Sequence, residues 1–169
     1  MGESDITKRA DWPFVQNGAV TLFLKQTILD AAIATMTREG YTVYQIDCGT
    51  EAKMVEDLAN ALHWVEQFGY TPDRLGLDAL NDALRGEPCE ERPKLLLVLK
   101  RFSGFRKRSK ETAQKVLDII EYQSRNHLLF GQRLLAFVHS NDPRFNIEGL
   151  GGRVAQWNKQ EWLMKSRGV

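Results

Sequence analysis

The sequence predicts an α/β fold in which a small parallel sheet is flanked by helices. The predicted elements follow the order strand, helix, strand, helix, helix, strand, helix, strand, which is typical of parallel strands joined by crossover helices. Residues 95–99 (Leu-Leu-Leu-Val-Leu) and 134–138 (Leu-Leu-Ala-Phe-Val) form continuous apolar runs. Strands that are buried on both faces have this composition. We therefore expect these two runs to be central, adjacent and parallel.

The first third of the chain supplies two strands and one helix. Residues 1–12 are polar and of mixed charge, which is typical of a loose terminus. Residues 19–25 are predicted as a strand, and residues 28–39 carry apolar side chains at helical spacing, with Gly40 placed to end the helix. Residues 41–47 alternate and are rich in β-branched and aromatic side chains, which predicts the second strand.

The middle of the chain contains two predicted helices before the next strand. Thr50 is suited to cap a helix that runs to about Gln67. A linker with Gly and Pro, residues 68–73, then leads into a short helix over residues 77–86. Gly86 is placed to end that helix in a left-handed conformation.

The second half alternates loops with the two buried strands. Residues 102–108 are predicted as a basic loop, followed by a helix that Ser109 caps and that runs to about Ser124. Residues 154–157 are predicted as a short strand. Residues 158–167 are predicted as a short helix, because Asn158 and Glu161 have capping-box spacing and Trp157 and Trp162 have the spacing of a hydrophobic staple. We expect these tryptophans to pack on the domain. The alternative is an exposed aromatic patch for a partner or a second copy.

Composition indicates one ordinary cytosolic domain. The chain has 169 residues, of which 43% are hydrophobic and 27% charged, with a net charge of +1. No apolar run reaches 18 residues and no leader-like segment opens the chain, so a membrane partner is not expected and a cytoplasmic location is. Cys48 and Cys89 are too few for a disulfide framework, and we expect them not to be bonded to each other.

The predicted helix over residues 77–86 has two different faces. Leu77, Leu80 and Leu84 share one face, whereas Asp78 and Asp82 share another that points away from the leucines. Two like charges at this spacing cost roughly 0.2–0.5 kcal/mol. Residues 73–91 contain six acids and two arginines, which gives a local charge of −4. The pattern fits either a solvated surface with internal ion pairs or a binding face.

The segment Gly-Leu-Asp-Ala-Leu-x-Asp-Ala-Leu-x-Gly, residues 76–86, resembles the acidic second helix of the barstar family, whose members are small cytosolic inhibitors of bacterial ribonucleases. The resemblance implies a two- or three-layer fold with a three-stranded parallel sheet flanked by helices. Residues 41–139 would form that core within a single domain, 1–169. Residues 13–40 would add an N-terminal strand and helix, and residues 140–169 a C-terminal extension with a short helix.

The resemblance also implies a function and a site. The chain would be a ribonuclease inhibitor and not an enzyme, with no cofactor and a monomer favoured. Asp82 would be the main anchor in the ribonuclease active site and Asp78 its partner. The neighbouring partner-binding positions would be Gly76, Asn81, Arg85 and, from the preceding loop, Tyr70.

The chain departs from barstar at several positions, which leaves the target open. Asn81 and Glu87 stand where barstar has tryptophans, and an acidic partner from barstar's third helix falls near Tyr122, with Glu121 beside it. The partner is therefore either a bacterial ribonuclease or a ribonuclease-like toxin domain for which this chain is the immunity protein.

An alternative function uses the basic segment. Residues 100–110 hold six basic residues and no acid, interrupted by Phe102 and Phe105, which is a pattern found in RNA-binding and regulatory modules. The competing interpretation is a solvated loop that Phe102 anchors in the core. A nucleic acid is the less favoured partner, because the chain as a whole is not basic. The three histidines lie in no metal-ligand spacing, and no catalytic or phosphate-binding motif is present.

Overall fold

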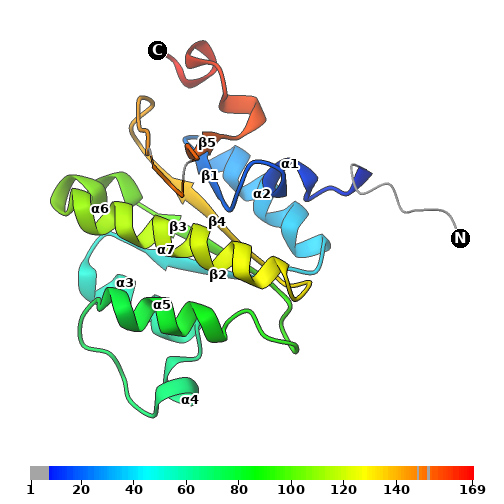
Figure 1. The fold of residues 1–169 in the computed structure, drawn as a ribbon. Helices are drawn as coiled ribbons and strands as arrows, with labels where there is room; N and C mark the ends of the chain where they lie inside the picture. The colour runs from blue at the N-terminus through cyan, green and yellow to red at the C-terminus, as the bar shows by residue number, and fades with distance from the viewer. Residues whose placement is uncertain (1–7, 148, 152) are drawn as a thin grey trace, which may run out of the picture.

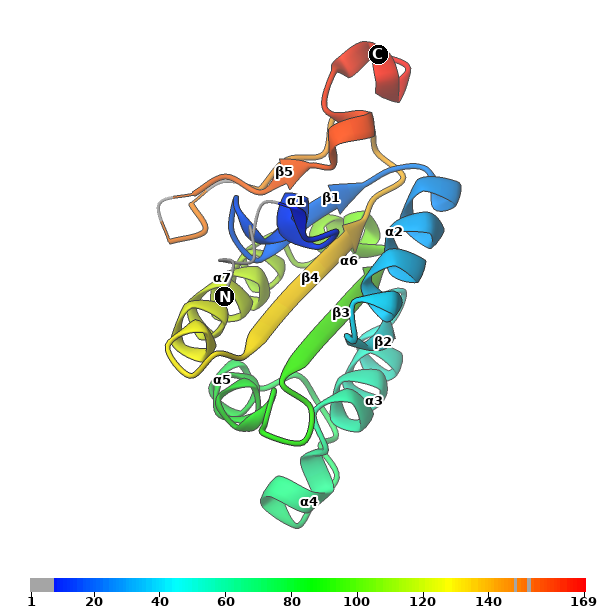
Figure 2. The same ribbon diagram turned by 90° about the vertical axis from the view of Figure 1, so that its right-hand side faces the viewer.

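The computed structural model describes residues 8–147, 149–151 and 153–169. Its sheet has five parallel strands in the order β2-β3-β4-β1-β5 (Figures 1 and 2). The strands are β1 Val20–Phe23, β2 Thr42–Asp47, β3 Lys94–Lys100, β4 Arg133–His139 and β5 Gln156–Trp157. The helices are α1 Trp12–Val15, α2 Gln26–Arg38, α3 Glu51–Ala61, α4 Trp64–Phe68, α5 Leu77–Gly86, α6 Phe102–Arg108 and α7 Lys110–Leu128.

The connections distribute the helices over both faces of the sheet. From β2 to β3 and from β3 to β4 the chain moves one place in the same direction, so right-handed crossovers put α3, α5 and α7 on one face. From β1 to β2 the chain moves in the opposite direction, which puts α2 on the other face. Figure 1 shows this arrangement, with the sheet between α2 and the group of α3, α5 and α7. The α/β prediction is confirmed, and the fold has three layers.

The two apolar runs form the centre of the sheet, as predicted. β3 and β4 are adjacent and parallel, with Leu97 opposite Ala136. Every side chain from 95 to 99 and from 134 to 138 is at most 3% exposed. Burial of these residues on both faces is what excludes polar side chains from the two runs.

The regions before and after the predicted core extend this sheet. β1 pairs with β4, and β5 pairs with the outer edge of β1. Phe14 of α1 packs against Phe137 at 4.9 Å between ring centroids, and Phe23 packs against the same ring at 4.7 Å. The N-terminal extension is thus part of the hydrophobic core.

Buried carboxylates hold both extensions in place. Glu121 of α7 accepts a hydrogen bond from the backbone N–H of Ala19 at 2.7 Å. Glu161, which is fully buried, accepts from the N–H groups of Leu24 at 2.9 Å and Lys25 at 2.8 Å. Buried N–H groups need such acceptors, because an unpaired one costs about 1–3 kcal/mol. Each extension is therefore fixed where its backbone meets a carboxylate from a distant part of the chain.

Asp11 makes a third junction of this kind. Its carboxylate accepts hydrogen bonds from Tyr41 Oη at 2.9 Å and Arg9 Nε at 2.9 Å, and Arg133 lies 3.6 Å away. Burial would raise the pKa of Asp11, but the hydrogen bonds from Tyr41 and Arg9 outweigh it and hold the pKa below its ordinary value. Burial, together with the hydrogen bond to Asp11, raises the pKa of Tyr41.

Two predicted elements in the first half need correction. The helix predicted from residue 51 to 67 is broken at His63, which adopts a left-handed conformation and separates α3 from α4. Thr50 caps α3 as predicted, accepting from the Lys53 N–H at 3.2 Å. Gly86 is the last residue of α5 and does not form the predicted left-handed cap. Glu87, which follows it, is extended.

The segment 102–108 is the helix α6, and its prediction as a loop was wrong. Phe102 and Phe105 lie three residues apart and are both buried, so the helix directs one face into the core. The glycine and the run of basic residues in this segment favoured a loop, so the helical spacing of the two phenylalanines was not recognised. α7 then extends to Leu128, and the side chain of Ser109 makes no capping hydrogen bond.

The C-terminal helix predicted over residues 158–167 is also wrong. The segment forms two 3₁₀ turns, Lys159–Glu161 and Met164–Arg167. Asn158 does cap the first turn, accepting from the Gln160 N–H at 3.1 Å, while Glu161 accepts from the N–H groups of Leu24 and Lys25, between β1 and α2. Trp157 is half-buried under the Arg167 guanidinium, but Trp162 is 54% exposed. Only one of the two tryptophans docks on the domain.

Candidate functional site

The acidic helix α5 is held by its apolar face. Leu80 and Leu84 are buried, as the leucine spacing predicted, and so is Ala83, whereas Leu77 is only half-buried against the core. Gly76 is the N-cap residue of α5. It has no side chain to accept a capping hydrogen bond, so only its backbone shapes the start of the helix. Asp78 lies in the first turn, where its charge interacts favourably with the helix dipole.

Helix α7 fixes α5 through two polar contacts. Gln123 Nε2 donates to Asn81 Oδ1 at 2.8 Å, and His127 Nε2 donates to the Leu84 carbonyl at 2.7 Å. Gln123 and His127 are both buried. These two residues were not predicted from the sequence, because they lie 42 and 43 positions from their partners. Asn81, predicted as part of the binding face, is half-buried and turned toward α7.

The end of α5 is closed by Gln67 of α4. Its amide nitrogen donates to the Leu62 carbonyl at 2.6 Å and to the Ala83 carbonyl at 3.2 Å, which satisfies carbonyl groups at the ends of α3 and α5. A Cβ on Gly86 would lie 2.1 Å from Gln67 Oε1. A side chain at position 86 would therefore displace Gln67 from these contacts.

The solvent-facing side of α5 presents Asp78, Asp82 and Arg85, all exposed. Arg85 Nη2 lies 3.6 Å from Asp82 Oδ1, with the side chains 69% and 54% exposed. An exposed pair of this kind is worth at most about 1 kcal/mol, so it leaves Asp82 available to another cation. Helix α5 is thus a well-anchored element whose carboxylates remain in water.

The acidity of this region is lower than the sequence indicated. Glu87 is buried and lies 2.7 Å from Arg92 Nη2 and 3.6 Å from His63 Nδ1. The Glu87 carboxylate is therefore paired within the protein and does not add to the exposed charge. Five exposed acids and two exposed arginines remain between residues 73 and 91, a balance of −3.

Tyr70 is 51% exposed and belongs to an aromatic cluster on α4. Its ring centroid lies 6.3 Å from those of Trp64 and Phe68. Gly69 ends α4 in a left-handed conformation and turns the chain so that Tyr70 folds back on that helix. The cluster borders the loop that leads into α5.

The two positions considered on α7 have opposite environments. Glu121 is 3% exposed and binds the Ala19 N–H, and a Cβ on Gly18 would lie 3.0 Å from its carboxylate. Tyr122 is 58% exposed. Glu121 is therefore committed to the N-terminal extension, and the exposed neighbour is aromatic and uncharged.

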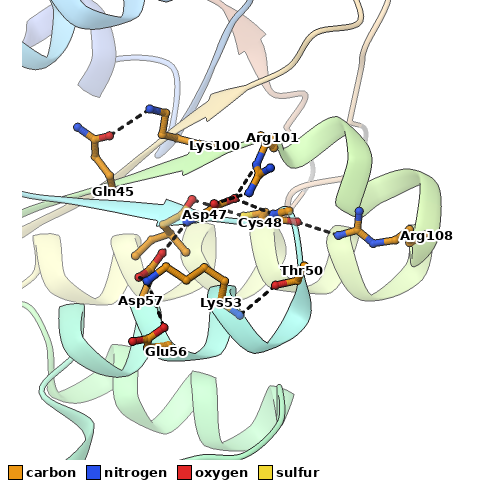
Figure 3. A network of polar contacts seen from close by, with 12 residues as sticks. Gln45, Asp47, Cys48, Thr50, Lys53, Glu56, Asp57, Lys100, Arg101 and Arg108 are labelled. Atoms are coloured by element: carbon orange, nitrogen blue, oxygen red, sulfur yellow. Dashed lines mark hydrogen bonds and ion pairs between the residues drawn. The ribbon is translucent and has the colours of Figure 1, made fainter.

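The basic segment is largely occupied by internal contacts (Figure 3). Arg101 pairs with Asp47, Arg108 Nη2 donates to the Cys48 carbonyl at 2.8 Å, and Lys100 Nζ donates to Gln45 Oε1 at 3.3 Å. Arg101 holds the pKa of Asp47 below its ordinary value through its hydrogen bond. Burial raises the pKa of the Cys48 thiol to about 12.

The aromatic residues of this segment face inward. Phe102 and Phe105 pack edge to face with centroids 5.4 Å apart, and Arg106 lies over the Phe145 ring at 5.3 Å. Base stacking needs an exposed ring. Phe102 is anchored in the core, as the competing interpretation of this segment held, and Phe105 is buried beside it.

Within the described residues no group of three His, Cys, Asp or Glu side chains could hold a metal ion. No helix of that part of the chain is long and apolar enough to cross a membrane. The two cysteines are free.

The molecule is thus a three-layer α/β protein with a parallel sheet and an acidic helix whose carboxylates are exposed. The family model described as barstar (barnase inhibitor) matches residues 41–138, more than half of the chain, and the chain belongs to that family. Proteins of the family are inhibitors and not enzymes. No curated protein sequence and no solved structure matches the chain.

Proposed function

We propose that this chain inhibits a barnase-type ribonuclease by inserting α5 into its cationic active site. The observation that carries the proposal is the pair Asp78 and Asp82, exposed on one face of a helix whose other face is buried. A ribonuclease surrounds the scissile phosphate with cationic side chains, and two carboxylates on a rigid helix replace that anion with charge-assisted hydrogen bonds.

The residues around the pair have separate roles in this proposal. Asp82 is the main anchor, and its contact with Arg85 at 3.6 Å is exchanged for a shorter one to the partner. Asp78 is the second anchor, one turn earlier. Asn81 orients the helix through Gln123, Gly76 shapes its start, and Tyr70 offers a ring at the border.

The biological setting follows from the same chemistry. An active ribonuclease is toxic to the cell that makes it, so we propose a cytoplasmic inhibitor that acts as the immunity protein of a ribonuclease or a ribonuclease-like toxin domain. RNA binding by the basic segment is disfavoured, because two of its arginines are hydrogen-bonded within the protein and its phenylalanines are buried.

The test is the substitution Asp82→Ala, measured for inhibition of a panel of barnase-type ribonucleases that includes barnase. We expect a loss of more than about 2 kcal/mol of binding, because the partner's cationic groups are left buried and unpaired. Thermal unfolding should change little, since the weak pair with Arg85 is offset by the better helix propensity of Ala.

The matched control is Asp30→Ala, an exposed acid on α2 across the sheet, which should inhibit like the parent. An Asp82→Ala protein that unfolds like the parent and inhibits with unchanged affinity would remove α5 from the mechanism.

A further inference from the structure

Helix α7 and the turn that follows it carry an exposed ridge beside α5. We define the α7 ridge as Tyr122, Asn126, Leu129 and Phe130. Tyr122 is 58% exposed, Leu129 82% and Phe130 79%. Large apolar side chains gathered on one side of a helix end, with a polar residue among them, mark a surface that a protein partner covers.

The ridge is fixed relative to the acidic helix. Asn126 Nδ2 donates to Gln123 Oε1 at 3.3 Å, and Gln123 Nε2 donates to Asn81 Oδ1 at 2.8 Å, so a chain of amides joins the ridge to α5. The helices run parallel, since position 81 meets 123 and position 84 meets 127 (Figure 1). The C-terminal end of α5, with Arg85, therefore lies beside the end of the ridge.

The exposed end of the ridge has an ordered backbone. The N–H groups of Phe130 and Gln132 both donate to the His127 carbonyl at 3.0 Å, and Gly131 supplies the positive φ that the turn requires. The turn therefore presents Leu129 and Phe130 from fixed positions. A partner would pay little entropy to immobilise this backbone.

An interface of ordinary size needs more contact area than α5 alone can supply. A stable protein–protein interface uses roughly 20–30 residues on each side. α5 has 10 residues, of which the apolar face is buried in the core. Helix α7, which is joined to α5 through the amide chain, is one rigid source of further contact area.

We infer that the α7 ridge is a second, apolar contact for the same ribonuclease that covers the acidic face. This inference rests on the proposed function. The partner then has a cationic cleft for α5 and, beside it, an apolar patch that receives Tyr122, Leu129 and Phe130. The carboxylates supply steering and orientation, whereas the ridge supplies buried apolar area and slows dissociation.

The test compares two double variants in the same ribonuclease panel. Leu129→Ser with Phe130→Ser removes the ridge, and Leu163→Ser with Met164→Ser removes a matched exposed pair, 71% and 57% exposed, from the C-terminal turns. We expect the ridge variant to bind at least 10-fold more weakly, through faster dissociation and by a similar factor at low and high salt. The control pair should bind like the parent. Tyr122→Ala should weaken binding in the same salt-independent way.

The outcomes separate the two proposals. If Asp82→Ala weakens binding and neither the ridge variant nor Tyr122→Ala does, the proposed function stands and the ridge is not part of the interface. If the parent inhibits no ribonuclease of the panel, the proposed function fails and this inference fails with it. Light scattering supplies the third outcome. A parent dimer that the ridge variant converts to a monomer with unchanged inhibition would assign the ridge to a second copy of this chain.

Discussion

The carboxylates of α5 and those that hold the two extensions in place are the same chemical groups in opposite environments. Asp78 and Asp82 are exposed, and the salt bridge of Asp82 to Arg85 is 3.6 Å long. Asp11, Glu121 and Glu161 are at most 3% exposed, and each accepts hydrogen bonds at 2.9 Å or less from donors distant in the chain.

The exposed acids are those to which we assign partner binding, whereas the buried acids hold the fold together. A buried carboxylate surrounded by donors stabilises the fold and has no capacity left for a partner. An exposed carboxylate on a firmly packed helix adds little to stability and keeps its acceptor capacity. Substitutions in the two regions should therefore affect different measurements.

The largest effect is expected at Glu161. Glu161→Ala leaves the N–H groups of Leu24 and Lys25 without their acceptor, which should lower the free energy of unfolding by about 3 kcal/mol. Urea unfolding measures this loss, with Glu111→Ala as the control because that side chain is 83% exposed. The folded fraction should still inhibit. Lost inhibition with parental stability would contradict the division between the two regions.

The second effect is on binding. Asp78→Ala should weaken inhibition by about 1–2 kcal/mol, less than Asp82→Ala, because the proposed function makes Asp78 the second anchor. Its unfolding free energy should fall by no more than about 0.5 kcal/mol, since the charge in the first turn is lost. Titration calorimetry against the inhibited ribonuclease is the measurement. An Asp78 effect larger than that of Asp82 would reverse the assignment of the main anchor.

The third effect concerns pH. The pKa of Asp11 is lower in the folded protein than its ordinary value of 3.8. A lowered pKa stabilises the fold fully above that ordinary value, and this stabilisation is lost as the pH falls through the folded pKa. Acid unfolding followed between about pH 5 and pH 2 should show a weaker pH dependence for Asp11→Asn than for the parent. The substitution should cost roughly 1 kcal/mol at neutral pH, because Asn keeps an acceptor for Tyr41. If the stability of the two proteins fell in the same way as the pH is lowered, Asp11 would not be what holds the extension.

The smallest effect is expected at the rim of the acidic region. Glu90 and Glu91 are exposed, so Gln at both positions should slow association a few-fold at low salt and leave dissociation nearly unchanged. Stopped-flow kinetics at two salt concentrations measures this. A change in the dissociation rate would place these acids inside the interface.

The sequence was sufficient where a pattern is local. The apolar runs at 95–99 and 134–138 identified the central strands, and the leucine and aspartate spacing of α5 predicted both of its faces. Burial on both sides of a strand, or on one side of a helix, constrains neighbouring residues in the chain. One segment therefore contains all the information that the prediction needs.

The tertiary structure decided what depends on residues far apart in the chain. The charge pattern did not show which acids are available to a partner. Glu87 is paired with Arg92 and Glu121 with the Ala19 N–H, whereas Asp82 has only a weak, exposed contact with Arg85. The break at His63, the helix at 102–108 and the amide chain from Asn126 to Asn81 also arise from packing between elements. A carboxylate has the same sequence signature in water and in a buried junction, and only the folded chain brings the donors that distinguish them.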